Sequence, residues 1–407
     1  MIEQKKKVLI INAYSYRNRG DAGIVVAMVD LIKLTFKNNV DISVMSQFHK
    51  ENLHFYEKMN VRSVPPVWDI LNQKVFIKKY FTGFKKVLFY KKQQTNEIIN
   101  ADLILSAGGG YLYSSKIGPL GIGFVNVLYH LWLSKKYKKK VVLFPQSVGP
   151  LKFSLDKIIL KKVFSKIDVL YSREKITSNF IKEKKVKIRL EQLPDIAFIL
   201  DSKKHTLLDG NLKEEENYLK IGITVLDWRF AIKGSDPSDI EDYLSKISNT
   251  INDLKYTTKQ KVKVYIFPQV TVSDLDGDFA VSLELHKKIN EESEIINLDK
   301  IQNPKELIYL YSKMDIFIGS RMHSAIFSLV GNVPTIALAY QPKTLGTFNL
   351  IGLEEFVLDI RTFQKKDLQN KIIELIKSKS KIKEDVYGQV TEIRQKIIYK
   401  LSQEIKQ

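Results

Sequence analysis

The chain has 407 residues, too many for one ordinary domain and suited to two domains that each bury a core. A hydrophobic content of 44% with 11% aromatic residues excludes a mainly disordered chain, and the absence of cysteine excludes disulfides, thiol nucleophiles and thiolate metal sites. The formal net charge of +20 favours anionic partners without choosing among them, and a lysine-rich composition explains it equally well. No segment resembles a nucleic-acid-binding module, so we expect no nucleic-acid partner.

The start of the chain leads directly from a charged segment into a short predicted strand, Lys7 to Ile11. A secretory signal peptide needs a longer apolar core and a small-residue cleavage site, so we expect a cytoplasmic protein. The apolar stretch Ile117 to Leu133 contains glycines, a proline, Asn126 and His130, and it is short for a membrane span. We therefore expect a buried helix after a glycine-rich turn.

The first strand opens into a turn with the sequence RNRGD, which precedes a predicted helix. Apolar residues of that helix recur every three or four positions, from Ile24 to Ile32. Asp21 lies where an N-cap residue would, and its carboxylate is equally suited to face a ligand; both roles stay open. A strand at Val40 to Met45 completes a first β-α-β unit.

The segment Lys74 to Lys92 alternates apolar residues at helical spacing with lysines. This pattern is typical of a basic amphipathic helix that lies on an anionic membrane surface, which would give peripheral membrane contact. A helix that packs on the core and exposes a solvated lysine face explains the pattern as well, and we favour that reading.

Three further apolar strands end in residues suited to a ligand pocket. The predicted strands are Ala101 to Ala107, Val141 to Phe144 and Val169 to Ser172. The residues that follow them are, in order, Gly108, Gly109 and Gly110; Pro145 and Gln146; and Arg173 and Glu174. Glycines permit close approach of backbone or ligand, and arginine suits an anion. A glycine-rich turn alone is a weak indicator.

A polar segment at residues 201–217 separates this half from a second series of strands and helices. That series begins with a strand at Tyr218 to Val225, a helix at Ser238 to Lys255 and a strand at Lys261 to Phe267. The last strand ends in Pro-Gln, as does the strand before Gln146, which suggests that the two halves are built alike.

Aspartates alternate in the sequence SDLDGD, at Asp274, Asp276 and Asp278. This spacing is suggestive of calcium, but no glutamate stands at the twelfth position of a loop that begins at Asp274. We therefore interpret the segment as a surface loop, and we expect no metal site in the protein.

The stretch Asp315 to Gly346 reads as strand, turn, helix and strand. In open α/β sheets the turn after a strand faces the ligand crevice, and the helix start offers backbone N–H groups to an anion. Arg321 supplies a fork of donors for phosphate or carboxylate, and His323 can transfer a proton near neutral pH. The alternative is that Arg321 pairs with a carboxylate and that His323 is a buried, satisfied histidine.

The two series predict an α/β protein with two doubly wound, Rossmann-like domains that face a cleft. We place the first domain, the expected acceptor side, at residues 1–200, the linker at 201–217 and the second domain, the expected donor side, at 218–385. A C-terminal helix at residues 386–407 is long enough to pack back on the first domain.

Six motifs together resemble the polysaccharide pyruvyl transferase family. They are NRGDAGI, LILSAGGGYL, FPQSVGP, YSREKITSNF, LPDIAF and IGSRMHSAIFSLVGNVPTIALAY, and the similarity runs from about residue 8 to residue 350. The resemblance implies a GT-B-like fold and transfer of a pyruvyl group from phosphoenolpyruvate to two hydroxyls of a sugar, with formation of a ketal and release of phosphate. The expected acceptor is then a galactosyl, glucosyl or N-acetylmannosaminyl residue of a cell-surface polysaccharide or of its lipid-linked precursor.

The same resemblance assigns roles to residues. Arg321 and His323 match the R-x-H of the donor site on the second domain, and Asp21 matches a G-D near the cleft. His323 is our candidate acid, Asp21 our candidate base and Arg321 our candidate anion ligand, and no metal or cofactor is required beyond phosphoenolpyruvate as a substrate. The other expected substrate-binding residues are Gly319, Ser320, Ser324, Arg173, Lys343, Gly108, Gly109, Gly110, Gln146 and Asn18.

Two other functions remain open. A GT-B glycosyltransferase that uses a nucleotide sugar would share the predicted fold and would bind UDP or GDP. A non-catalytic scaffold would keep the fold and lose the donor site, which the presence of Arg321, His323 and Asp21 disfavours. The sequence identifies neither the acceptor sugar nor the oligomeric state.

Overall fold

The structure is a computed structural model of the chain, and it describes residues 4–69, 92–204, 218–230, 232, 234–272, 277–301 and 303–407. The predicted basic helix that begins at Lys74 lies outside these residues except for Lys92, and the predicted linker is described only at residues 201–204. Contacts within the chain form two compact units. The first comprises Met1–Tyr16, Ile24–Ile196 and Ile397–Gln407, and the second comprises Arg17–Gly23 and Ala197–Lys396.

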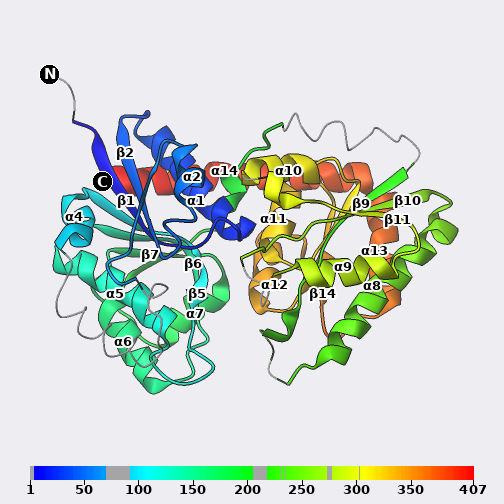
Figure 1. Cartoon of the computed structure of the whole chain (residues 1–407), viewed down its shortest axis with the longest axis horizontal. Coiled ribbons are helices and arrows are strands. Elements are labelled where there is room, and N and C mark those ends of the chain that lie inside the picture. Colours follow the sequence, from blue (N-terminus) through cyan, green and yellow to red (C-terminus); the bar gives the residue numbers. More distant parts are fainter. Residues whose placement is uncertain are drawn as a thin grey trace. The chain divides into compact units, whose positions relative to one another are not determined.

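The first unit contains a parallel sheet with the strand order β3-β2-β1-β4-β6-β7-β8, and β5 pairs with β6 beyond the end of β4 (Figure 1). Its strands are β1 Lys6–Ala13, β2 Val40–Ser46, β3 Arg62–Val64, β4 Leu103–Ser106, β5 Gly109–Leu112, β6 Val141–Val148, β7 Val169–Ser172 and β8 Arg189–Gln192. The chain moves outward from β1 in one direction and then in the other, so the carboxyl ends of β1 and β4 flank a switch point, where ligands bind in such sheets.

Helices connect these strands. They are α1 Arg19–Thr35, α2 Leu53–Glu57, α4 Lys92–Asn100, α5 Ile122–Lys136, α6 Ser154–Phe164 and α7 Lys175–Glu183. The residues of α1 up to Gly23 belong to the second unit. Helix α5 is the buried helix that the apolar stretch before Leu133 predicts. Its apolar side chains join those of the central strands in one buried cluster, which holds the carboxyl ends of the strands in place.

The second unit repeats this architecture with the strand order β11-β10-β9-β12-β13-β14, in which every neighbouring pair is parallel. Its strands are β9 Tyr218–Thr224, β10 Lys261–Ile266, β11 Glu292–Ile295, β12 Ile316–Gly319, β13 Thr335–Ala339 and β14 Val357–Asp359. Its helices are η1 Ile196–Ile199, η2 Trp228–Phe230, α8 Pro237–Thr258, α9 Phe279–Lys288, η3 Leu298–Lys300, α10 Pro304–Tyr311, α11 Met322–Val330, α12 Pro342–Asn349, η4 Glu354–Phe356 and α13 Lys365–Lys377.

The prediction of two doubly wound α/β units is confirmed. The predicted strand-turn-helix-strand stretch corresponds to β12, α11 and β13, and it occupies the switch point beside β9. Apolar runs predict such strands well, because a parallel strand is buried on both faces.

The two halves are built alike, as the sequence suggested, but the two Pro-Gln pairs do not occupy equivalent positions. Gln146 lies within β6, the fifth strand position of its sheet, whereas Gln269 follows β10, which corresponds to β2. The prediction that Pro145 ends a strand is also wrong. Strand β6 pairs with β4 only as far as Leu143 and shifts register against β7 before Gln146, so the missing N–H of Pro145 falls at an irregularity of the ladder.

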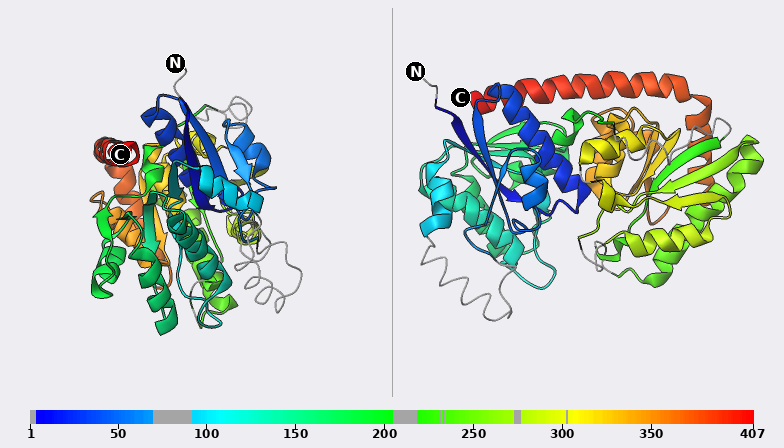
Figure 2. Two further views of the ribbon diagram at one scale, coloured as in Figure 1. Left: turned by 90° about the vertical axis from the view of Figure 1, so that its left-hand side faces the viewer. Right: turned by 45° about the horizontal axis from the view of Figure 1, so that its top comes forward.

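Helix α14, Lys379–Lys406, is the predicted C-terminal helix and begins earlier than expected (Figure 2). Its residues from Ile397 onward belong to the first unit, where Glu404 accepts hydrogen bonds from Tyr171 and Arg189 and forms an ion pair with Lys140. Among the described residues, no helix is both long enough and apolar enough to cross a bilayer.

Candidate active site

The turn between β12 and α11 is anchored to β9 by hydrogen bonds. The N–H of Ser320 donates to the carbonyl oxygen of Thr224 at 3.2 Å and to its Oγ1 at 3.1 Å. The hydroxyl of Ser324 donates to the carbonyl oxygen of Arg321 at 2.6 Å and contacts Thr224 Oγ1, also at 2.6 Å. These bonds hold the turn at the switch point in one conformation.

Ser320 and Ser324 are both buried, and their hydroxyls bond within the protein. Ser320 Oγ lies 2.6 Å from the hydroxyl of Tyr243 on α8. A Cβ added to Gly319 would lie 3.1 Å from the nitrogen of Ala325, so this glycine allows α11 to start close to β12. Gly319, Ser320 and Ser324 therefore position the turn, and their predicted contact with a substrate stays a prediction.

Arg321 forms a bidentate ion pair with Asp278. Its Nε lies 3.2 Å from both carboxylate oxygens, and its Nη2 lies 2.5 Å from Oδ1. Asp278 is fully buried, and its burial raises the pKa of the carboxyl while the guanidinium of Arg321 acts in the opposite direction. The carboxylate partner that the sequence left open for Arg321 is present, and it fixes the direction of the guanidinium.

The interpretation of Asp278 as a surface-loop residue is wrong. Its carboxylate accepts a hydrogen bond from the N–H of Val270 at 2.9 Å, and its own N–H donates to the carbonyl of Val270 at 2.8 Å. Asp274 and Asp276 lie outside the described residues. Asp278 is buried because it compensates the charge of a residue that is distant in sequence, which the local pattern does not reveal.

The NRGD motif packs against the same region of the second unit. Asn18 forms an antiparallel bridge with Val270, and the N–H of Arg19 donates to the carbonyl of Gln269 at 3.3 Å. The N–H of Thr271 donates to the carbonyl of Arg17 at 3.1 Å. The motif thus lies beside the loop that carries the carboxylate partner of Arg321.

His323 lies against the start of α1. A Cβ added to Gly20 would lie 2.7 Å from Cγ of His323, and a Cβ added to Gly23 would lie 2.5 Å from Cζ of Phe327. The two glycines belong to the second unit and permit close packing of the first turn of α1 on α11 within it. Asp21, the candidate base, follows Gly20 directly, so the structure groups the three predicted catalytic residues in one unit.

Asn18, not Asp21, caps helix α1. The side-chain oxygen of Asn18 accepts hydrogen bonds from the N–H groups of Gly20 at 3.1 Å and of Asp21 at 3.4 Å. Asp21 lies in the first turn, where a carboxylate is favoured by the helix dipole. The N-cap role that the sequence suggested for Asp21 is therefore wrong, because Asn18 fills that position.

The family model of the polysaccharide pyruvyl transferases, "Polysaccharide pyruvyl transferase", matches residues 18–342, from the NRGD motif to the start of α12. The chain belongs to this family. It is also 23% identical to the amylovoran biosynthesis protein AmsJ of Erwinia amylovora, over 95% of this chain and 96% of that protein. The predicted membership is confirmed, and the chain is a transferase of polysaccharide biosynthesis.

Solved structures of GT-B type resemble this pyruvyl transferase family member in fold. The UDP-GlcNAc 2-epimerase of Neisseria meningitidis has a TM-score of 0.57 at 11% identity, covering 97% of this chain and all of that one. The sucrose-phosphate synthase of Thermosynechococcus elongatus has a TM-score of 0.58 at 10% identity, covering 99% and 98%. The predicted GT-B-like fold is thereby confirmed.

Arg173, a predicted phosphoenolpyruvate ligand, lies in the first unit of this family member and is fully buried. Its Nη1 lies 2.8 Å from Asp195 Oδ2, and its Nε donates to Ser147 Oγ at 2.7 Å. The contacts of the guanidinium are thus internal to the first unit, and Arg173 is not grouped with Arg321. Lys343 belongs to the second unit and lies in the first turn of α12, which follows the strand next to β12.

The predicted glycine turn and Gln146 lie side by side in the first unit. A Cβ added to Gly108 would collide with the carbonyl oxygen of Pro145, and Gly109 has a φ of +138°, which side chains rarely permit. Gly109 and Gly110 begin β5, and Gly109 is paired with Gln146. Gln146 is fully buried, and neither atom of its amide has a hydrogen-bond partner among the described residues.

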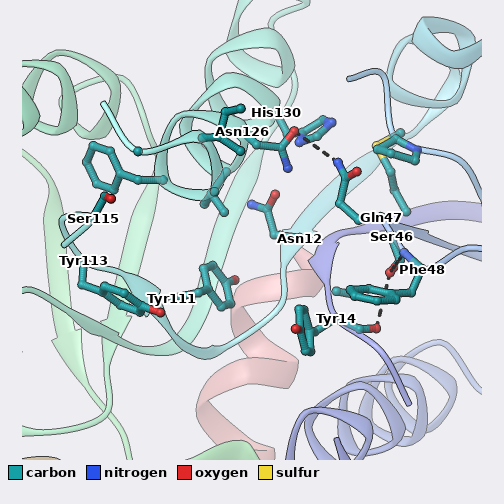
Figure 3. A pocket seen from close by; sticks show the side chains of 18 of the residues that line it. Asn12, Tyr14, Ser46, Gln47, Phe48, Tyr111, Tyr113, Ser115, Asn126 and His130 are labelled. Atoms are coloured by element: carbon teal, nitrogen blue, oxygen red, sulfur yellow. Dashed lines mark hydrogen bonds between the residues drawn. The ribbon is translucent and has the colours of Figure 1, made fainter. Parts of the chain in front are cut away.

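A cavity of about 540 Å³ lies at the carboxyl ends of β1 and β2 in the first unit (Figure 3). Its lining includes Asn12 and Tyr14, just after the first strand, and Asn126 and His130 on α5. None of these residues was predicted to belong to a site. The available signal was the occurrence of polar residues in an otherwise apolar helix.

Groups of three or more histidine, aspartate or glutamate residues that are suited to a metal ion do not occur in the described part of the chain. Titratable residues at the switch point of the second unit are instead arranged in ion pairs and close packing contacts, as Arg321 and Asp278 are. This arrangement suits recognition of an anion by a guanidinium and a helix start.

Proposed function

We propose that this protein transfers a pyruvyl group from phosphoenolpyruvate to two hydroxyls of a sugar in a cell-surface polysaccharide or its lipid-linked precursor. The reaction forms a ketal and releases phosphate. The main support is the arrangement of Arg321, which Asp278 holds by a bidentate ion pair, two residues before His323, whose ring packs on Gly20. Family membership supports the same general activity.

The donor carries a phosphate and a carboxylate, and both need cationic or N–H donors. Arg321 is held in a fixed direction and is 14% exposed, so it need not be ordered when the donor binds. Helix α11 begins at the same place, and the side chain of its N-cap residue, Arg321, makes no capping hydrogen bond to the N–H groups of the first turn. Lys343 in the first turn of α12 adds a further positive charge in this unit. We assign these three features to donor binding.

The chemistry begins with addition of a proton to the methylene carbon of phosphoenolpyruvate. The carbon that bears the phosphate then carries positive charge, and the first sugar hydroxyl adds to it while losing its proton. The second hydroxyl adds to the same carbon, the bond from that carbon to the phosphate oxygen breaks, and the second proton leaves. Two hydroxyl protons are released for the one that was consumed, and phosphate departs with its electron pair.

His323 is the proposed acid, since an imidazolium can donate a proton near neutral pH. Asp21 is the proposed base for a sugar hydroxyl, because it adjoins the glycine on which the imidazole ring packs. Arg321 offsets the charge of the departing phosphate, so the proposed reaction needs no metal ion.

The test is release of phosphate from phosphoenolpyruvate by the purified protein, with a panel of sugars and lipid-linked sugars, beside calorimetric titration with phosphoenolpyruvate, UDP and GDP. We expect saturable binding of phosphoenolpyruvate, and phosphate release only when a suitable acceptor is present. Arg321→Ala should abolish that binding. Arg361→Ala is the matched control, since Arg361 forms a similar pair with Asp359 but is half-exposed.

Other outcomes would exclude parts of this proposal. Binding of UDP or GDP without binding of phosphoenolpyruvate would favour a nucleotide-sugar glycosyltransferase. A His323→Gln protein with normal turnover would exclude His323 as the acid, with His286→Gln as a control for a histidine elsewhere in this unit. His286 contacts Ser293 at 2.8 Å and is distant in sequence from the turn.

A further inference from the structure

The cavity in the first unit combines aromatic rings with neutral polar side chains. Its aromatic lining residues are Tyr14, Phe48, Tyr111, Tyr113 and Phe124, and its neutral polar ones are Asn12, Ser46, Gln47, Ser115 and Asn126. Among the described residues that line it there is no aspartate or glutamate, and Lys116 is the one lysine or arginine. The volume of about 540 Å³ falls within the range of about 300–1,000 Å³ that is usual for ligand pockets.

Asn12 is placed in this cavity by an unusual backbone. Its φ of +62° is left-handed, and the pairing of β1 with β2 shifts register between Ile10 and Ala13. Such irregularities redirect side chains near binding sites. The Nδ2 of Asn12 donates to Ser106 Oγ at 3.1 Å, while its buried Oδ1 has no hydrogen-bond partner among the described residues.

Asn126 and His130 on α5, together with Gln47 just after β2, contribute a second set of polar groups. The Nε2 of Gln47 donates to the carbonyl oxygen of Trp68 at 2.6 Å and lies 3.3 Å from Asn126 Oδ1, which orients both amides (Figure 3). His130, one turn after Asn126, is 2% exposed, and neither ring nitrogen makes a well-formed hydrogen bond within the described residues.

His130 is a neutral group in this cavity. Burial lowers the pKa of His130 to about 4, and the backbone of Asn126 acts in the opposite direction. A neutral imidazole both donates and accepts a hydrogen bond, and so does a sugar hydroxyl. Buried polar atoms are rarely left without partners, so Asn12 Oδ1 and the imidazole of His130 point to a ligand with hydrogen-bond donors and acceptors.

The aromatic rings supply the complementary surface. Tyr14 and Phe48 pack edge to face with ring centroids 4.8 Å apart, and the hydroxyl of Tyr111 donates to the carbonyl of Ala107, which fixes its ring. Figure 3 shows Asn12 between these rings and the amides of Gln47 and Asn126. Tyr113 is 53% exposed at the cavity. Aromatic faces are electron-rich and suit the C–H groups of a sugar ring.

We propose that this cavity binds an uncharged sugar ring of the acceptor, with the amides and His130 bonding its hydroxyls and the tyrosines stacking on its C–H face. The assignment to the acceptor rests on the proposed function. The described lining residues include no carboxylate and one lysine, which favours a neutral hexose or N-acetylhexosamine over a uronic acid.

The test measures sugar binding in the absence of phosphoenolpyruvate. Methyl glycosides of galactose, glucose, N-acetylmannosamine and glucuronic acid are titrated at millimolar concentrations, with binding followed by ligand-detected NMR. We expect at least one neutral glycoside to bind and the glucuronide to bind more weakly. Tyr113→Ala and Asn126→Ala should weaken that binding, and raise the KM for the acceptor, by about tenfold or more, which is about 1.4 kcal/mol.

The control is Tyr399→Ala, which removes an exposed tyrosine of the first unit outside the cavity. Because Asn126 is buried, thermal unfolding checks that variant, and Tyr113→Ala alone is decisive if Asn126→Ala fails to fold. Neither cavity variant should alter binding of phosphoenolpyruvate, whereas Arg321→Ala should lose that binding and keep the sugar.

Each contrary result is informative. If no neutral glycoside binds, if both variants retain wild-type sugar binding, or if they lose phosphoenolpyruvate instead, the cavity is not the acceptor site. If sugars bind through Tyr113 but phosphoenolpyruvate never binds, the cavity assignment stands as a sugar site and the proposed pyruvyl transfer fails.

Discussion

The backbone of Gly20 lies directly against the imidazole ring of His323, so that a Cβ at Gly20 would come within 2.7 Å of Cγ of that ring. The two residues lie near the starts of α1 and α11, and both belong to the second unit. This contact joins the NRGD motif to the R-x-H motif. It explains why a glycine, which is unfavourable inside a helix, stands in the first turn of α1.

Gly20→Ala should lower both stability and donor binding. Alanine is more favourable than glycine in a helix by about 1 kcal/mol. A net loss of stability must therefore come from the collision of the new Cβ with His323, and such overpacking typically costs about 1–3 kcal/mol. Urea unfolding and titration with phosphoenolpyruvate measure the two effects. Gly388→Ala is the control, because a Cβ there meets no atom within 4 Å, and it should stabilise the protein. Equal behaviour of the two variants would contradict the argument.

Asp278→Ala should destabilise the protein by about 3 kcal/mol or more, because it removes the carboxylate that compensates a largely buried arginine. Donor binding should weaken with it, since Arg321 loses its fixed direction. Asp359→Ala removes the carboxylate of an exposed pair with Arg361 and should cost less than about 1 kcal/mol. Chemical unfolding of the two variants gives the comparison, and similar losses would show that burial of the pair is unimportant.

Asn18→Ala should cost about 1 kcal/mol, because Asn18 caps α1. Serine is a good N-cap residue, so Asn18→Ser should restore the free energy of unfolding. If capping is the whole role of Asn18, the serine variant also has a normal KM for phosphoenolpyruvate. A stable serine variant with a raised KM would instead support the substrate contact that the sequence suggested.

Stability should fall as the pH drops from about 6.5 towards 4, in part because of His130. Burial lowers the pKa of His130 from 6.5 to about 4, so in this window the unfolded chain binds a proton that the folded protein does not. The contribution of neutral His130 to the free energy of unfolding is fully present well above pH 6.5, and about 3 kcal/mol of it is lost near pH 4. His130→Gln should reduce the pH dependence of the unfolding free energy, whereas His54→Gln, at an exposed position, should leave it unchanged.

Much of the fold was predictable because parallel strands are buried on both faces and read as apolar runs. The predicted strand Val169 to Ser172 matches β7, and the predicted strand Lys261 to Phe267 matches β10 with one residue fewer. Proline misled the prediction at Pro145, since a proline at an irregularity of a sheet looks the same in sequence as one at a strand end.

The candidate site was predictable only in part. Arg321 and His323 were found because a polar pair at a strand end is conspicuous in an apolar sequence. Asp278 was misjudged because its burial depends on an arginine 43 positions away. Asn12 and His130 were missed because they are distant in sequence, and their convergence on one cavity appears only when β1 and α5 pack together.

Local sequence patterns were thus sufficient to predict most strands and helices in their order, and the motifs were sufficient to predict the family. The tertiary structure alone decided which distant residues share an environment, such as Gly20 with His323 and Asn12 with His130. Local patterns encode backbone preference and burial along one element, whereas the burial of a charge or an amide depends on partners that only packing brings within a few ångströms.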